Sequence, residues 1–185
     1  MGLIKQEFRN EYTKGTVFVL DYPAKEFREH LVNNTTYSEN PRINAAAQVA
    51  SMKMLRRTIQ SMKHGDTRPI RLHTIVCTPL TADNANDATS KQYMFANAVA
   101  GAITSAIVFL VGKKMPKKVQ DNKTANTGIS ATVSLVIGSR VRKYIINNIR
   151  KYNAGDVDIM TFIEVNGGIG PQYSFNGTYL TLDEY

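Results

Sequence analysis

The sequence predicts an α+β fold with a mostly antiparallel sheet. Segments rich in β-branched and aromatic residues recur along the chain and are bounded by Gly or Pro, as strands are. Other segments repeat apolar residues at three- and four-residue steps, as amphipathic helices do. The chain has 185 residues, which is the length of one domain, so we expect residues 1–185 to form a single domain.

Composition excludes several classes of protein. The chain is 43% hydrophobic and 21% charged, which rules out collagen, coiled-coil rods and wholesale disorder. Its single Cys excludes an internal disulfide framework, and together with only three His it argues against a structural zinc cage. The first residues lack the apolar stretch of a secretory signal, so we expect no signal peptide.

The first half of the chain contains two expected strands and two expected helices. Residues 5–13 are mixed and fit a short helix or an arm, and a strand is expected at 16–20 after Gly15. A short amphipathic helix is expected at about 24–32, opened by Pro23. A long helix follows at about 44–63, and residues 69–79, which have a proline at each end, alternate as a strand does.

Residues 94–112 are ambiguous. They carry no charge over 19 positions and precede a lysine cluster, which are the length and flank of a membrane-spanning helix. Their second half is rich in β-branched residues, and residues 129–137 alternate between apolar and largely hydroxyl-bearing side chains. We therefore expect a long β-hairpin, about 103–111 and 129–137, joined by a flexible basic loop at 112–128. A helix ending near Ala106 that leads into the strand and a bilayer span are the alternatives.

The last third returns to a clear pattern. A helix is expected at about 140–152, ended by Gly155. Strands are expected at 157–165 and 172–182, because both segments are rich in β-branched or aromatic residues.

Charge is unevenly distributed along the chain. The net charge is +8. Residues 94–155 carry 10 Lys or Arg against one Asp, whereas residues 156–185 carry 5 acids and no Lys or Arg. Such segments can pair within one chain, pair between copies, or leave the basic part for a polyanion.

The candidate contact residues follow from this distribution. Basic residues expected to contact a polyanion or a neighbouring subunit are Arg56, Arg57, Lys63, Lys113, Lys114, Lys117, Lys118, Lys123, Arg140, Arg142 and Lys143. Acidic residues expected at a contact between subunits are Asp156, Asp158, Glu164, Asp183 and Glu184. The basic residues would contact phosphates rather than read bases, because no recognition helix or stacking motif accompanies them.

Motifs that would indicate catalysis are absent from the sequence. It contains no Walker phosphate loop, no nucleophile elbow and no paired zinc-ligand spacing. His73 and Cys77 would share one face of a strand but lie roughly 13 Å apart, and Cys77 fits better as a small buried apolar residue. We therefore predict no catalytic residue, cofactor or metal.

The leading functional hypothesis is a non-enzymatic structural subunit of a homo-oligomeric ring or tube. Complementary basic and acidic segments suit head-to-tail contact between copies, and a long hairpin suits a closed wall. Tailed bacteriophages use such subunits as neck, tail-terminator, connector or tail-tube proteins, an analogy of architecture that rests on no family motif. It implies a virion or host-cytoplasm location, contact with other structural proteins of the assembly, and DNA passing through. The alternatives are a sequence-independent nucleic-acid-binding protein and a membrane protein spanning at 94–112.

Overall fold

The computed structural model describes residues 2–62, 66, 68–81, 88–113, 123–165 and 172–181, without the side chains of 113, 123–134 and 172–174. The chain divides into two compact units. We call the first the sheet unit, which consists of Met1–Lys5, Phe18–Cys77 and Val157–Tyr185. The second is the helical-hairpin unit, which consists of Gln6–Val17 and Thr78–Asp156.

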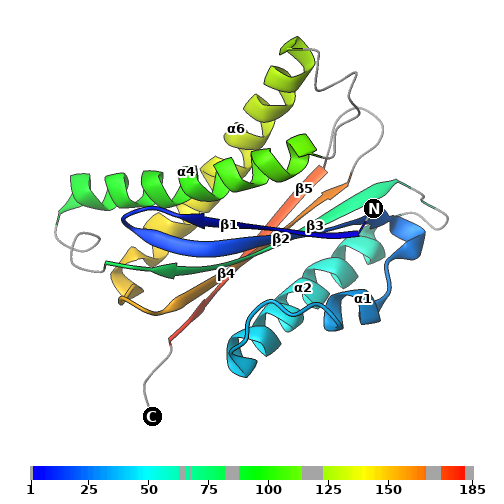
Figure 1. Ribbon diagram of the computed structural model, residues 1–185, viewed down its shortest axis with the longest axis horizontal. Coiled ribbons are helices and arrows are strands. Elements are labelled where there is room, and N and C mark those ends of the chain that lie inside the picture. The colour runs from blue at the N-terminus through cyan, green and yellow to red at the C-terminus, as the bar shows by residue number, and fades with distance from the viewer. Residues whose placement is uncertain are drawn as a thin grey trace. The chain divides into compact units, whose positions relative to one another are not determined.

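The chain forms a five-stranded antiparallel sheet in which the strands follow one another in sequence order (Figure 1). The strands are β1 Gly2–Arg9, β2 Thr13–Pro23, β3 Pro69–Pro79, β4 Val157–Val165 and β5 Gln172–Leu180. The predicted α+β class and antiparallel sheet are confirmed. Strands β3 and β4 have the predicted bounds, whereas the helix or arm expected at 5–13 is wrong, because residues 5–9 extend strand β1.

Strand β4 lies in the interior of the sheet. It pairs with β3 on one side, where Thr161 is opposite Thr74, and with β5 on the other, where Met160 is opposite Gly177. All nine of its residues are buried. A strand that is paired along both edges and buried on both faces is typically a continuous apolar run rather than an alternating one. This strand follows that pattern except at Asp158, Thr161 and Glu164.

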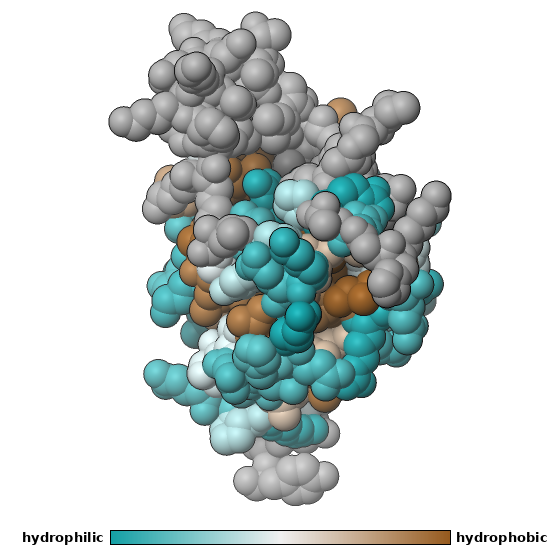
Figure 2. All heavy atoms as spheres, turned by 90° about the vertical axis from the view of Figure 1, so that its right-hand side faces the viewer, coloured by the Kyte–Doolittle hydropathy of each residue, from teal (hydrophilic) through white to brown (hydrophobic). Residues whose placement is uncertain are grey.

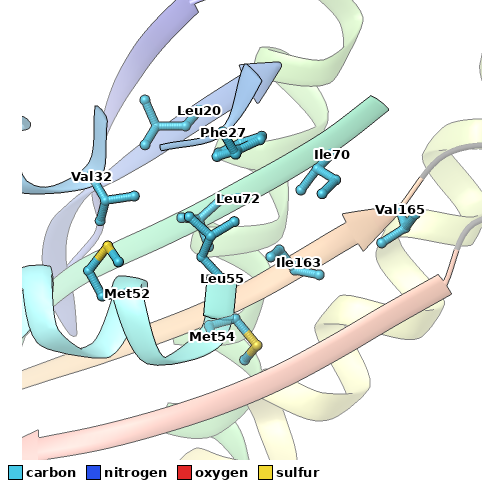
Figure 3. Packing of buried hydrophobic residues seen from close by; sticks show 10 residues of the cluster. All are labelled: Leu20, Phe27, Val32, Met52, Met54, Leu55, Ile70, Leu72, Ile163 and Val165. Atoms are coloured by element: carbon cyan, nitrogen blue, oxygen red, sulfur yellow. The ribbon is translucent and has the colours of Figure 1, made fainter. Parts of the chain in front are cut away.

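Helix α2, Pro41–Ser61, packs its apolar stripe against one face of the sheet (Figures 1 and 3). Met52, Met54 and Leu55 of the helix meet Leu72 of β3 and Ile163 of β4. The predicted helix at 44–63 is thus confirmed with an earlier start. Its N-cap is residue 40, an asparagine whose side chain accepts two backbone N–H groups of the first turn.

The short helix expected at about 24–32 is divided in two. A 3₁₀ turn, η1 Ala24–Glu26, is followed by the single-turn helix α1 Glu29–Asn33. Phe27 lies between them with extended backbone and a side chain that is only 3% exposed. Burial of this ring among the residues of Figure 3 is favoured over the continuous helix that the spacing predicts.

The predicted β-hairpin is wrong, because both of its expected strands are helical in the helical-hairpin unit. Residues 103–111 lie in helix α4, Thr89–Lys113, and residues 129–137 lie in helix α6, Lys123–Asn148. Residues 123–128 of the expected loop are helical as well, and residues 114–122 lie outside the described residues. The predicted helix at 140–152 is the end of α6 and a 3₁₀ turn, η2 Ile149–Lys151.

Close packing of the two helices accounts for this outcome. A Cβ placed on Gly138 of α6 would lie 3.2 Å from the Thr104 hydroxyl oxygen of α4, so the glycine lets the two backbones approach. Ile137, Val141 and Ile145 recur at four-residue steps and are at most 3% exposed. This four-residue period, set by tertiary packing, prevails over the local preference of β-branched residues for strands.

The turn between β1 and β2 is held within the same unit by Asn10. Its side-chain oxygen accepts the backbone N–H groups of Tyr12 and Thr13, both at 2.9 Å, in an Asx-type turn. Its amide nitrogen donates to the carbonyl oxygen of Ala98 in α4 at 3.0 Å. The ring of Phe95 contacts Tyr12 edge to face with the centroids 5.7 Å apart. One asparagine therefore connects the strand turn to the helix.

Residues 89–112 form a helix long and apolar enough to cross a membrane, and 56% of its most apolar window is buried inside the protein. Helices in the cores of soluble proteins meet the same criterion. On the side of the molecule drawn in Figure 2, hydrophilic and hydrophobic residues are interspersed among the described atoms.

The core of the sheet unit yields a first prediction. Leu55→Ala removes a side chain that is 2% exposed and leaves a cavity, so we expect the free energy of unfolding to fall by about 2–5 kcal/mol. Val49→Ala on the same helix removes a side chain that is 68% exposed, and we expect a change within about 0.5 kcal/mol. Urea unfolding followed by circular dichroism measures both. Equal losses would contradict the packing of α2 described here.

Candidate nucleic-acid interface

The exposed face of helix α2 carries a row of cations. Arg42, Lys53, Arg56 and Arg57 are all exposed, and we call these four residues the basic face. The helix, Pro41–Ser61, contains no Asp or Glu. The opposite stripe of the helix is in the core, so the backbone presents these cations from a rigid support.

A shallow groove of about 590 Å³ runs along this face. It is lined by Asn33, Ala45, Gln48, Val49, Met52, Lys53, Arg56, Arg57 and Gln60. Its wall is held in place by Gln48, whose amide nitrogen donates to the carbonyl oxygens of Asn33 at 2.6 Å and Thr35 at 3.2 Å. The groove therefore offers three cations, several amide donors and a small apolar floor.

Arg56 already has an acidic neighbour within the protein. Its Nη2 lies 2.6 Å from Oε1 of Glu29, and both side chains are 61% exposed. An ion pair this exposed contributes about 0–1 kcal/mol, because water and salt screen it. A phosphate group can therefore replace Glu29 as the partner of Arg56 at little cost.

A second hollow, of about 430 Å³, has a mixed lining. It lies between the ends of β1 and β2, where Arg9 and Lys14 stand beside Glu7. Because a carboxylate accompanies the two cations, this hollow is a weaker anion site than the groove on α2.

The remaining predicted cations are not among the described residues that line the groove. Arg140, Arg142 and Lys143 are exposed on helix α6 of the helical-hairpin unit. Lys113 ends α4 and Lys123 begins α6, but their side chains are outside the described part of the chain. Lys63, Lys114, Lys117 and Lys118 also lie outside the described residues. Of the predicted basic residues, the structure therefore places Arg56 and Arg57 together in the groove.

Three of the predicted acidic contact residues are buried, which is a correction. Asp156, Asp158 and Glu164 are 4%, 2% and 7% exposed. Two of them belong to the interior strand β4, and Asp156 accepts the backbone N–H of Asn153 at 3.2 Å. They cannot form an exposed acidic surface for a neighbouring subunit. Asp183 and Glu184 lie outside the described residues.

Glu164 is instead part of a charged cluster inside the sheet unit. Nη1 of Arg71 lies 3.8 Å from Oε2 of Glu164, and Nε of the same guanidinium lies 3.4 Å from Oδ2 of Asp21. The three side chains are 9–19% exposed. Arg71, on β3, thus connects the carboxylates of β2 and β4. Removing one member of such a cluster leaves a buried charge without compensation, so its role is structural.

His73 borders this cluster, and sequence reasoning did not anticipate its surroundings. It is fully buried and stacks on Phe162 with the ring centroids 4.4 Å apart and the planes at 17°. Nε2 lies 3.7 Å from Oε2 of Glu164, too far for a hydrogen bond, and neither ring nitrogen has a hydrogen-bond partner in the described part of the protein. Burial lowers the pKa of His73, and the neighbouring Glu164 only partly opposes this.

The described residues offer neither a cluster of metal ligands nor an exposed cysteine. No three His, Cys, Asp or Glu side chains among the described residues lie close enough to hold a metal ion. Cys77 is 3% exposed, as expected for a small apolar residue.

No family model matches the chain, and the searches of curated proteins and of solved structures found no match either.

The burial of His73 yields a second prediction. Because burial holds its pKa below the unfolded value of about 6.5, the unfolded chain takes up the proton first as the pH falls. The free energy of unfolding should therefore decrease as pH falls below about 6.5. His73→Phe keeps the stacking on Phe162 and removes the titration, so its stability should depend less on pH between about 6.5 and 5. Urea unfolding at several pH values tests this, and identical pH slopes would contradict it.

Proposed function

We propose that the protein binds nucleic acid without sequence specificity through the basic face of α2. The observation that carries the proposal is one rigid helix face with four exposed cations in a helix that has no Asp or Glu. The overall charge of +8 adds long-range attraction for a polyanion. No catalytic step is part of this proposal.

The type of side chain supports backbone contact rather than base readout. The groove offers two guanidinium groups and one ammonium group, and guanidinium groups bind phosphate oxygens in a bidentate manner. Phosphate contacts position a protein on nucleic acid but carry no sequence information. None of the described residues that line the groove is aromatic, so none of them offers a ring on which an unpaired base could stack. A duplex backbone is therefore the favoured ligand.

Salt-dependent binding provides the third prediction. We expect the protein to bind a random-sequence DNA duplex at low salt, with an affinity that falls as salt rises. The triple variant K53Q/R56Q/R57Q should bind more weakly and reduce the slope of log K against log salt by about 0.9 for each lost phosphate contact. Fluorescence anisotropy over a salt series measures both quantities.

A variant of equal net charge separates the groove from the overall charge. K5Q/K14Q/K25Q also removes three exposed cations, none of which belongs to α2 or lines its groove. It should retain the affinity and the slope of the parent more closely than the groove variant does. If both variants lose the same affinity, the basic face has no special role. If the parent does not bind DNA at low salt, the proposed function is wrong.

A second proposal keeps the structural subunit of a homo-oligomeric ring, of the kind found in bacteriophage necks and tails. The observation that favours it is that the sheet is open, with β1 and β5 as its two edge strands. Edge strands present unpaired backbone groups that can pair with another copy, and joining β1 of one copy to β5 of the next would give a head-to-tail ring. The predicted hairpin wall no longer supports this proposal, because residues 103–111 and 129–137 are helical. Asp156, Asp158 and Glu164 do not support it either, because they are buried.

Assembly provides the fourth prediction. Under this second proposal, light scattering should give a mass that is a multiple of 20.6 kDa. Leu3→Lys places a charge on the edge strand, at a side chain that is 49% exposed, and should lower that mass. Val49→Lys, on the exposed face of α2, is the control and should leave the mass unchanged. A strict monomer at high protein concentration would exclude the ring for the isolated protein.

A further inference from the structure

The helical-hairpin unit carries exposed apolar side chains that nucleic-acid binding does not use. On helix α4, Tyr93, Met94 and Phe109 are 43%, 56% and 48% exposed. Asn97, Gly101 and Ser105 are also exposed, and at 100° per residue the six residues together span about 160°, which is the exposed side of the helix. Helix α6 adds Leu135, which is 73% exposed, the largest exposed fraction of any large apolar side chain described.

The exposed faces of the two helices meet at a cation. The guanidinium carbon of Arg142 on α6 lies 5.3 Å from the centroid of the Tyr93 ring on α4, a cation–π contact. Leu135, Ser139 and Arg142 are exposed at steps of four and three residues, so they share a face of α6. We call the surface formed by Tyr93, Met94, Phe109, Leu135 and Arg142 the hairpin face.

The two helices that form this surface carry charge of one sign. Neither α4 nor α6 contains an Asp or Glu. The cations of the two helices are Lys91, Lys113, Lys123, Arg140, Arg142 and Lys143. Two copies meeting through this face would bring their cations together, which disfavours self-association. A nucleic-acid backbone would leave the apolar side chains in water, so the complementary partner is both anionic and apolar.

The packing of α4 distinguishes a helix that spans a membrane from one that lies at its surface. Ile103, Ile107 and Leu110 are at most 1% exposed, and Gly138 brings α6 close to Thr104. Spanning a bilayer with α4 would require these buried side chains to leave the protein interior. A surface of a few apolar side chains bordered by Arg and Lys is instead typical of elements that lie in the interface of a membrane.

We propose that the hairpin face docks on the surface of a membrane that contains anionic lipids. Met94, Phe109 and Leu135 enter the boundary between headgroups and acyl chains, and Arg140, Arg142 and Lys143 contact the anionic headgroups. Apolar burial and attraction to the anionic lipids then add to each other. This differs from the membrane span considered for residues 94–112, because the helices stay packed. It does not depend on the nucleic-acid function of α2.

Vesicle binding tests this proposal, which is the fifth prediction. The full-length protein should float with phosphatidylcholine vesicles that contain phosphatidylglycerol, and much less with phosphatidylcholine alone. The variant M94S/F109S/L135S should bind the anionic vesicles about tenfold more weakly, since three partly exposed apolar side chains lose their burial in lipid. R140Q/R142Q/K143Q should bind more weakly too and should lose most of the salt dependence.

A matched variant controls for the loss of apolar surface in general. L3S/V49S/I59S also replaces three exposed apolar side chains, which are 49%, 68% and 40% exposed, and all of them belong to the sheet unit. It should bind the vesicles as the parent does. Circular dichroism before flotation ensures that only folded variants are compared.

Three outcomes would overturn the proposal. The first is equal vesicle binding by M94S/F109S/L135S and L3S/V49S/I59S. The second is loss of vesicle binding in K53Q/R56Q/R57Q but not in the hairpin variants, since the basic face of α2 would then be the lipid contact. The third is a parent dimer, seen by light scattering, that M94S/F109S/L135S dissociates, since a second copy would then cover the hairpin face. Failure of DNA binding alone would leave the membrane proposal standing.

Discussion

The burial of strand β4 is the constraint on which the sheet unit depends. Burial of a polar group costs free energy unless a partner compensates it, and the buried strand β4 contains Asp158, Thr161 and Glu164. For Glu164 the compensation comes from Arg71 on the neighbouring strand, which also contacts Asp21. The same covered sheet surrounds His73 and keeps it from exchanging hydrogen bonds with water. The order of strands β2, β3 and β4 thus lets Arg71 compensate the carboxylates of Asp21 and Glu164 inside the sheet unit.

This burial also changes the surface of the protein. Asp156, Asp158 and Glu164 are withdrawn from solvent, whereas the cations of α2 and of the end of α6 stay exposed. The described surface is therefore more basic than a count along the chain indicates. This basic surface favours binding of anionic partners and disfavours an acidic contact between subunits. For that reason we place nucleic-acid binding ahead of the ring assembly that the segment charges favoured.

Both proposed surfaces carry exposed cations, but the side chains beside these cations differ between the two surfaces. On α2 the cations border a groove with amide groups and one exposed valine, which suits phosphates in water. On the helical hairpin the cations border Met94, Phe109 and Leu135, which suits a partner with an apolar interior. The apolar content beside the cations, rather than the number of cations, distinguishes the two partners.

Short-range patterns in the sequence determined the strands at 69–79 and 157–165, the helix around residues 44–61, and the exposure of Arg56 and Arg57. In these segments, local preference and tertiary packing agree. Only the tertiary structure decided the helical hairpin and the place of Glu164. Residues 129–137 alternate like a strand, but in the folded protein they belong to a helix that packs on α4, with Gly138 close to Thr104. A charge count likewise cannot tell an exposed acid from one that meets Arg71 inside the sheet, because the pairing joins residues 93 positions apart.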